Sequence, residues 1–299
     1  MRAVWSFWSR PFEAHKCFIW HKPLHHLLAW GLSLRAAARH YPETVLITDR
    51  AGKKLLVDRL GLSFTHVSTE LDRLQDADPD WWALGKLVAY NVQDRPFVHL
   101  DTDVFLWRPL PPNLTQAAVF AQNPEYPGFH ATNSYGAPHE IERSFATDGI
   151  ELPVEWQWAR SRDEWYFPEE NCGILGGTQI EFIRYYSGLA LDLVLNPKHR
   201  PAWARLGDKK VYNMVVEQFL LSACVAYHRF HPVSPFRGVK IKHLFRGVCE
   251  AFDWQEAAKK GYTHLMGGAK SNPTVGRRLE ERTKREDPAF FRMCEALCN

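Results

Sequence analysis

Two aspartates one residue apart, Asp101 and Asp103, directly follow the apolar run Phe97–Leu100 in this chain of 299 residues. The run predicts a buried strand, and side chains two positions apart on a strand point to the same side. In open α/β sheets, ligands bind at the carboxyl ends of the strands. Two neighbouring carboxylates repel each other unless a cation lies between them, and their hard oxygen ligands suit Mg²⁺ or Mn²⁺. We therefore interpret Asp101 and Asp103 as a candidate site for a divalent cation.

The D-x-D spacing by itself is not specific, because Asp76, Asp78 and Asp80 repeat it in the same chain. That segment is polar, contains a proline and follows no apolar run, so we interpret its carboxylates as solvated charge and as a helix N-cap. The buried strand before Asp101 and Asp103 is what distinguishes them. The alternative for this pair is a turn at the end of the strand, in which the two carboxylates cap nearby backbone groups.

The segment His264-Leu-Met-Gly267-Gly-Ala-Lys270 is a second candidate site. A histidine at the end of a short predicted strand can present a neutral imidazole to a metal. Gly267 and the glycine after it allow the backbone to approach an anion closely, and Lys270 would bring a positive charge to a phosphate. One histidine among 14 is more often structural, but His, Gly and Lys at this spacing form a more specific pattern.

The strand followed by D-x-D, together with the later H-x-x-G-x-x-K, resembles the retaining GT-A glycosyltransferases. The nearest type is the group of the bacterial lipopolysaccharide galactosyltransferase and glycogenin. The resemblance implies that Asp101, Asp103 and His264 bind Mn²⁺ (or Mg²⁺), and that this metal holds the diphosphate of a UDP-sugar. It also implies that Lys270 contacts the phosphates and that Gly267 lies at the diphosphate.

Three further segments occur in the order that the same family shows. Lys86, about 15 residues before Asp101, matches a basic residue that touches the donor in the family. Asn171, which begins Asn-Cys-Gly, resembles the N-x-G segment near the donor sugar. Glu217 and Gln218 resemble an acidic-Gln pair beside the anomeric carbon. The alternatives are a solvated helix residue for Lys86 and a surface helix charge for Glu217.

The reaction implied by the resemblance moves a hexose from a UDP-sugar to an acceptor hydroxyl, with retention at the anomeric carbon. The metal and Lys270 would stabilise the charge that develops on the leaving UDP. Glu217 or Gln218 would line the donor sugar and steady a cation-like transition state, and we assign no covalent nucleophile. The resemblance extends over residues 85–271, and Ser271-Asn272 stands where the family usually has Pro-Trp.

The site for the uracil base is less clearly marked. Asp49 and the segment 4–7 end the first two predicted strands, at the edge where the base should lie. Asp49 can accept the uracil N–H, and Trp5 or Trp8 would stack on the ring, with core packing as the alternative. The acceptor is left open among a glycan, a lipid, a peptide and a small molecule. The candidates for acceptor contacts are His130, Asn133 and residues 156–165.

Strand-like and helix-like segments alternate up to Asp103, which indicates an α/β domain with a mostly parallel sheet. With the resemblance, this predicts a GT-A-like, Rossmann-type sheet flanked by helices, with an irregular, acceptor-binding second half. The expected strands cover residues 3–7, 44–48, 63–67, 97–100, 117–122, 172–175, 240–244 and 263–266. The expected helices cover residues 24–40, 53–60, 81–92, 182–195 and 210–226. Residues 9–12 are expected to form a turn, and residues 123–168 loops with some short strands.

No linker or internal repeat divides the chain, so we expect one domain over residues 1–299. Within it, residues 1–122 would form the nucleotide-binding half and residues 123–276 the half for the donor sugar and the acceptor. Residues 277–299 are strongly charged and are expected to form a surface helix.

The composition, with 45% hydrophobic and 24% charged residues, excludes a disordered or coiled-coil chain. A net charge of +3 does not indicate bulk binding of nucleic acid. Six cysteines without a CxxC pair argue against a zinc knuckle and a disulfide scaffold. No stretch approaches the roughly 18 uncharged apolar residues of a membrane helix, and the first residues lack the apolar stretch of a signal peptide. We therefore expect a reduced, cytoplasmic protein without a transmembrane segment.

Two other classes of function stay open: a different metal enzyme of phosphate chemistry, and a non-catalytic sugar-binding protein. A nucleotidyltransferase that makes nucleotide sugars would carry a basic, glycine-rich loop after the first strand, and the segment SFWSRPFEAHK has no glycine. A two-metal nuclease would need more clustered carboxylates. A non-catalytic sugar-binding protein on a transferase fold is the other possibility, and the complete set of Asp101, Asp103, His264 and Lys270 argues against it.

Overall fold

The computed structural model describes residues 1–15, 19–126, 137–162 and 167–298. Within these ranges seven strands form one sheet in the order β3-β2-β1-β4-β7-β6-β8, and β5 and β9 form a separate two-stranded ribbon. The strands are β1 (Arg2–Phe7), β2 (Thr44–Thr48), β3 (His66–Ser68), β4 (Phe97–Leu100), β5 (Val104–Leu106), β6 (Val119–Glu125), β7 (Glu169–Gly177), β8 (Ile241–His243) and β9 (Tyr262–His264).

The direction of the strands defines the carboxyl edge of the sheet. β3, β2, β1 and β4 pair in parallel, and β7 runs antiparallel to both β4 and β6. β6 therefore has the direction of β4, and β8 pairs in parallel with β6. The expected α/β class, with a mostly parallel sheet flanked by helices, is confirmed.

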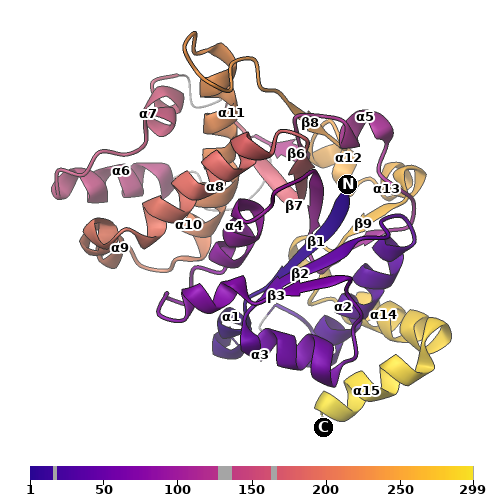
Figure 1. Ribbon diagram of the computed structural model, residues 1–299. Helices are drawn as coiled ribbons and strands as arrows, with labels where there is room; N and C mark the ends of the chain where they lie inside the picture. The colour runs from indigo at the N-terminus through magenta and orange to yellow at the C-terminus, as the bar shows by residue number, and fades with distance from the viewer. Residues whose placement is uncertain (16–18, 127–136, 163–166, 299) are drawn as a thin grey trace.

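Helices cover both faces of the sheet, as Figure 1 shows. One face packs against α4 (Ala83–Asn91), α8 (Ile180–Leu195) and α11 (Leu220–Phe230), and the other against α2 (Pro23–Ala38) and α15 (Pro288–Cys298). Alternation along the strands divides the apolar side chains between the two cores. Val4 of β1 faces α4, whereas its neighbour Trp5 faces α2.

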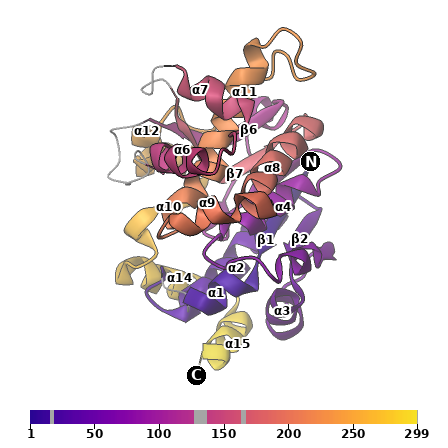
Figure 2. The same ribbon diagram turned by 90° about the vertical axis from the view of Figure 1, so that its left-hand side faces the viewer.

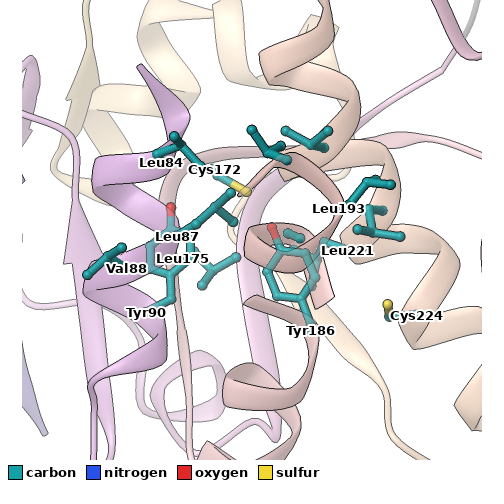
Figure 3. Packing of buried hydrophobic residues seen from close by; sticks show 14 of the residues in the cluster. Leu84, Leu87, Val88, Tyr90, Cys172, Leu175, Tyr186, Leu193, Leu221 and Cys224 are labelled. Atoms are coloured by element: carbon teal, nitrogen blue, oxygen red, sulfur yellow. The ribbon is translucent and has the colours of Figure 1, made fainter. Parts of the chain in front are cut away.

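The core on the α4 face is formed by elements that are distant in the sequence. Figure 3 shows Leu87 of α4 beside Cys172 and Leu175 of β7, with Tyr186 of α8 and Leu221 of α11 closing the cluster. All five side chains are fully buried. The same helices, α4 and α11, flank the charged side chains described below, so this packing holds the candidate site in place.

Most of the remaining helical segments are short. They are α1 (Ser9–His15), α3 (Arg50–Lys53) with the π-helical turn η1 (Lys54–Arg59), η2 (Glu70–Leu74), α5 (Pro112–Thr115), α6 (Ala137–Thr147), α7 (Val154–Arg160), η5 (Pro197–His199), α9 (Arg200–Arg205), α10 (Lys210–Met214), the π-helical turn η6 (Val215–Phe219), α12 (Val248–Phe252), α13 (Trp254–Lys260), η7 (Gly267–Ala269) and α14 (Pro273–Glu286).

Two expectations for loops and turns are wrong. The turn expected at residues 9–12 is the start of α1, whose first residue, Ser9, donates its backbone N–H and its hydroxyl to Asp49. The loops expected over residues 123–168 are largely helical where the structure describes them, because α6 and α7 bury Phe145 and Trp156 in the core. The burial of an apolar face, not local propensity, stabilises such short helices.

The single surface helix expected over residues 277–299 is also wrong. The chain forms two helices, α14 and α15, and breaks at Asp287, because a proline disfavours the helical conformation of the residue before it. α15 packs on α2 so closely that a Cβ at Gly31 would lie 2.2 Å from the ring of Phe290. Figure 2 shows α15 at the end of the molecule opposite α7 and α11.

Among the helices in the described ranges, none has both the length and the apolar character that a bilayer crossing requires.

Candidate metal centre

The D-x-D segment is a turn, and the expectation that a strand holds both aspartates on one face is wrong. β4 ends at Leu100, and the backbone N–H of Val104 donates to the carbonyl of Asp101 at 3.0 Å. The N–H of Asp101 donates to the carbonyl of Gly173 on β7 at 3.0 Å. The turn lies at the carboxyl edge of the sheet, with Asp101 beside α4 and Asp103 beside β9.

The ribbon of β5 and β9 brings His264 to the turn. Val104 is paired with His264 in this antiparallel ribbon, and the N–H of Leu265 donates to the carbonyl of Asp103 at 3.1 Å. Asp101, Asp103 and His264 each offer one ligand atom, and these three atoms lie within 4.8 Å of one another. The predicted metal ligands, about 160 residues apart in the sequence, are therefore neighbours in the fold.

Lys270 lies at the rim of this cluster. Its Nζ is 2.7 Å from Oδ2 of Asp103, and Nε2 of His264 is 3.5 Å from the same oxygen. Burial alone would raise the pKa of Asp103, but Lys270 and His264 hold that pKa well below its usual range. Gly267 has a φ of +52°, the left-handed region that favours glycine. The turn after β9 thus depends on this glycine to direct the chain toward Lys270.

On the α4 side of the turn, a buried lysine joins two carboxylates. Nζ of Lys86 is 2.9 Å from Asp101 and 2.9 Å from Glu217, and the hydroxyl of Tyr90 donates to Glu217 at 2.8 Å. Glu217 is 0% exposed and the side chain of Lys86 is 11% exposed. The alternative interpretations, a solvated lysine and a glutamate on a helix surface, are therefore wrong. Burial raises the pKa of Glu217, and Lys86 opposes that shift.

Glu217 and Gln218 lie on the π-helical turn η6, between α10 and α11. Such turns interrupt α-helices and are frequent at functional sites. Oε2 of Glu217 and Oε1 of Gln218 are buried and have no hydrogen-bond partner within the described part of the chain. A buried oxygen without a partner costs free energy, so both atoms are candidates for contact with a ligand.

Asn171 lies on β7, next to the cluster. Its amide Nδ2 donates to Glu125 at 2.7 Å, and its Oδ1 accepts from the N–H of Gly173 at 3.0 Å. A Cβ at Gly173 would lie 2.5 Å from the His264 ring. The glycine of the Asn-Cys-Gly segment is therefore required by the close approach of His264.

The structure gives Asp49 a structural role and leaves its contact with uracil a prediction. Its Oδ1 accepts from the N–H of Gly52 at 2.7 Å and its Oδ2 from Ser9, so the carboxylate caps α3 and ties α1 to it. Trp5 is fully buried on the α2 face and donates to Ser33 at 3.0 Å, and Trp8 is 5% exposed. For both tryptophans core packing, not stacking on a base, is what the structure shows.

Among the candidates for acceptor contacts, His130, Asn133 and residues 163–165 lie outside the described residues. Trp156 is 1% exposed and donates to Glu142 at 2.9 Å, so its expected acceptor contact is wrong. A cavity of about 570 Å³ opens beside the carboxyl end of β6, where Tyr126, Arg246 and Glu250 line it.

Gln122, a neighbour of the metal ligands, is absent from the sequence-based candidates. Its Oε1 lies 2.7 Å from Nδ1 of His264 and accepts from the hydroxyl of Tyr262 at 2.5 Å. It is 0% exposed on β6. The signal in the sequence is slight: one polar residue that ends the apolar run Val119-Phe-Ala.

Comparisons with known proteins add the following. A family model described as a family of unknown function (DUF6734) matches residues 1–297. No curated protein matches the chain. Among solved structures, the chain is similar to a galactosyltransferase, LgtC, in complex with donor and acceptor sugar analogues. That similarity covers 87% of this chain and 95% of the other, with 10% sequence identity and a TM-score of 0.38, values at which it carries no argument about activity.

Proposed function

Because the chain belongs to the family of unknown function DUF6734, its activity has to be argued from its own site, and we propose a metal-dependent glycosyltransferase. It would move a hexose from a UDP-sugar to an acceptor hydroxyl, with retention at the anomeric carbon. One observation carries the proposal: Asp101, Asp103 and His264 meet at the carboxyl edge of the sheet, with Lys270 beside them. Ligands bind at this edge in α/β folds.

The three side chains fit a divalent cation. Two carboxylates and one imidazole form a donor set that suits Mn²⁺, and oxygen ligands also suit Mg²⁺. Oδ2 of Asp103 is buried, with the ammonium of Lys270 at 2.7 Å and Nε2 of His264 at 3.5 Å. When bound, the metal would supply positive charge to the diphosphate of the donor.

Lys270 would hold the phosphates. It is the charged end of the short turn that follows Gly267, and its ammonium already lies at the rim of the cluster, 2.7 Å from Asp103. In the reaction the bond between C1 and the β-phosphate oxygen breaks, and UDP leaves with the electron pair. A positive charge at this point stabilises the leaving group as its negative charge grows.

Glu217 and Gln218 would line the donor sugar. Each has a buried oxygen without a partner, and oxygens of this kind stabilise positive charge at the anomeric carbon. The acceptor oxygen would bond to C1 from the side of the departing UDP, and its proton would pass to the phosphate oxygen that leaves. Lys86 holds Asp101 and Glu217 at equal distances of 2.9 Å and so would join the metal side of the site to the sugar side.

The acceptor would enter through the cavity at the end of β6. Glu125, at the end of this strand, accepts from Asn171, the residue proposed to lie near the donor sugar. The cavity is lined by an aromatic ring and by charged side chains, among them Tyr126, Arg246 and Asp253, which suits a polyhydroxylated acceptor. Residues 1–122 would then bind the nucleotide and residues 123–276 the sugar and the acceptor, with His264 and Lys270 of the second half also holding the metal and the phosphates.

The test is calorimetry of UDP binding with and without Mn²⁺. We expect Mn²⁺ to strengthen UDP binding in the parent protein and in His66→Ala, a variant of an exposed histidine on β3. In His264→Ala this effect of Mn²⁺ should disappear. An equal effect of Mn²⁺ in His264→Ala would contradict the proposal.

A panel of UDP-sugars then separates the alternatives. A glycosyltransferase releases UDP from one of them in the presence of Mn²⁺, and the anomer of the product tests retention. A sugar-binding protein releases no UDP. A nucleotidyltransferase would instead release pyrophosphate from UTP and a sugar phosphate.

A further inference from the structure

We propose that Gln122 is a positioning residue that selects the tautomer of His264 needed for metal binding. A buried chain of hydrogen bonds runs from the carbonyl of Pro124 through Asn123 and Gln122 to Nδ1 of His264. It places the ring proton on Nδ1 and leaves the lone pair of Nε2 toward Asp103. The inference deepens the proposed function and rests on its metal site.

The chain of hydrogen bonds begins at a group whose role is unambiguous. The carbonyl oxygen of Pro124 can only accept, and the amide of Asn123 donates to it from Nδ2 at 3.2 Å. Oδ1 of Asn123 is therefore the atom on the other side, where Nε2 of Gln122 donates to it at 3.0 Å. Both side chains are 0% exposed, so water does not compensate a reversed amide.

The orientation of Gln122 follows from this order. Its Nε2 faces two acceptors, Oδ1 of Asn123 and, at 3.2 Å, the sulfur of Met266. Its Oε1 faces the hydroxyl of Tyr262 and Nδ1 of His264. With the amide of Gln122 reversed, its oxygen would face two acceptors, Oδ1 of Asn123 and the sulfur of Met266, and the hydrogen bonds to both would be lost.

Tyr262 supports the same orientation. It is 3% exposed, and its hydroxyl donates to Oε1 of Gln122. Oε1 of Gln122 thus accepts from Tyr262 and has its second lone pair available for His264, 2.7 Å away. An accepting oxygen at that distance requires a proton on Nδ1.

The consequence lies on the other side of the ring. A neutral imidazole with its proton on Nδ1 has a lone pair on Nε2, and that atom is 3.5 Å from Oδ2 of Asp103. Nε2 of His264 and Oδ2 of Asp103 then face each other as two candidate ligands of a metal ion, with the ammonium of Lys270 2.7 Å from the same oxygen. Without the acceptor on Gln122, the proton could move to Nε2 and donate to Asp103, which would remove a ligand. Partners of this kind commonly fix the tautomer of metal-binding histidines.

Close packing around the His264 ring prevents the imidazole from rotating away from Gln122. At Gly173 a Cβ would lie 2.5 Å from Cε1 of His264 and 2.5 Å from Oε1 of Gln122. The imidazole of His264 and the amide of Gln122 therefore both pack directly against Gly173 of β7. Rotation of the imidazole away from Gln122 would need the strand to move.

The experiment reads the tautomer directly, in the metal-free protein. Proton–nitrogen NMR of ¹⁵N-histidine-labelled protein, at a pH where the imidazole is neutral, distinguishes protonated Nδ1 from protonated Nε2. The signal of His264 is identified by its loss in His264→Ala. We expect protonated Nδ1 in the parent protein, and protonated Nε2 there would overturn the proposal without any variant of Gln122.

Two variants at one position separate positioning from packing. Gln122→Met keeps the size of the side chain and removes the acceptor, so we expect protonated Nε2. Gln122→Glu keeps an acceptor for His264, so we expect protonated Nδ1, as in the parent. If Gln122→Met is folded by thermal unfolding and still shows protonated Nδ1, the proposal is overturned.

Metal affinity provides the second readout. Calorimetry with Mn²⁺ alone should show binding weakened by about 10–100-fold in Gln122→Met, the range found for lost partners of metal-binding histidines, and much less in Gln122→Glu. Equal loss in both variants would overturn the positioning role. If the parent binds no divalent cation, the proposed function fails, while the NMR reading still decides whether Gln122 sets the tautomer.

Discussion

The two sides of the D-x-D turn differ in how their charged groups are arranged. On the α4 side, Lys86 joins Asp101 and Glu217 at 2.9 Å each, and Tyr90 donates to Glu217. On the β9 side, Asp103 faces a histidine nitrogen at 3.5 Å with only Lys270 in close contact. In the first arrangement one ammonium bridges two carboxylates inside the protein. In the second, Oδ2 of Asp103 and Nε2 of His264 face each other beside Lys270 as candidate ligands of a cation.

The difference predicts that the two sides respond differently to substitution. A buried charge cluster contributes little net stability, yet the removal of one partner is strongly destabilising, because a charge is left buried and unpaired. A set of metal ligands that lacks its metal contributes little to folding, so its loss should appear in binding. The α4 side should therefore control stability and the β9 side binding.

The largest effect is expected at Asp103. In Asp103→Ala we expect UDP release that depends on Mn²⁺ to fall by roughly 100-fold or more, since a bound metal contributes several kcal/mol of charge stabilisation. Kinetic assays with the active UDP-sugar measure this. The control is Asp78→Ala, since Asp78 belongs to the other D-x-D matches and accepts a backbone N–H within its own turn. Equal losses in the two variants would show that the wrong pair has been chosen.

The next largest effect concerns Lys86. Lys86→Met should lower the free energy of unfolding by about 3–5 kcal/mol, the usual result of breaking a buried pair. Urea denaturation measures it, with Lys53→Met on the exposed side of α3 as the control. Glu217→Gln in the Lys86→Met background should restore part of the loss. If the single variant is as stable as the control, the α4 side does not behave as a buried charge cluster.

A smaller and more local effect is expected at Gly173. An added Cβ would lie 2.5 Å from the His264 ring, so Gly173→Ala should displace the ligand and weaken Mn²⁺ binding by about 10-fold, at the low end of the range for a disturbed ligand environment. Calorimetry measures this. Gly188→Ala on α8, where the nearest atom would be 3.4 Å away, should leave Mn²⁺ binding unchanged. Loss of binding in both variants would mean that the packing against His264 is not the cause.

The smallest expected effect is on how the free energy of unfolding changes with pH, and it has opposite signs at two glutamates, Glu217 and Glu280. Burial raises the pKa of Glu217, so the folded state keeps a proton that the unfolded chain has lost. Its contribution to stability is therefore full below the unfolded pKa, about 4.3, and falls as the pH rises through the folded value. Urea denaturation of Glu217→Gln across this range should show the parent losing stability relative to the variant.

Glu280 is the matched control for this dependence. Burial would raise its pKa, but the hydrogen bond from His25 and the charge of Lys22 lower it. Its contribution is therefore present above the unfolded pKa and is lost as the pH falls through the folded value. In Glu280→Gln the difference from the parent should shrink toward low pH. The same sign in both variants would contradict the contrast between them.

The sequence predicted those parts of the fold whose signals are local. β2 and β4 have the bounds that their apolar runs predict, because a buried strand ends where polar turn residues begin. α6 and α7 were missed because Phe145 and Trp156 look like isolated aromatics until their packing partners are known. The convergence of His264 on Asp101 and Asp103 followed from the family pattern, not from any local signal.

The amino-acid types that the sequence supplies determine which chemistry is available: two carboxylates after a strand, a histidine, two glycines and a lysine. Only the tertiary structure decides how they are used. The pairing of β5 with β9 sets which residue faces Asp103, and pairing between distant strands leaves no local trace in the sequence. The tautomer of His264 depends on Gln122, whose orientation depends on Asn123 and a carbonyl oxygen. The direction of each hydrogen bond depends on groups that are neighbours only in the folded chain, so the sequence alone does not determine the tautomer.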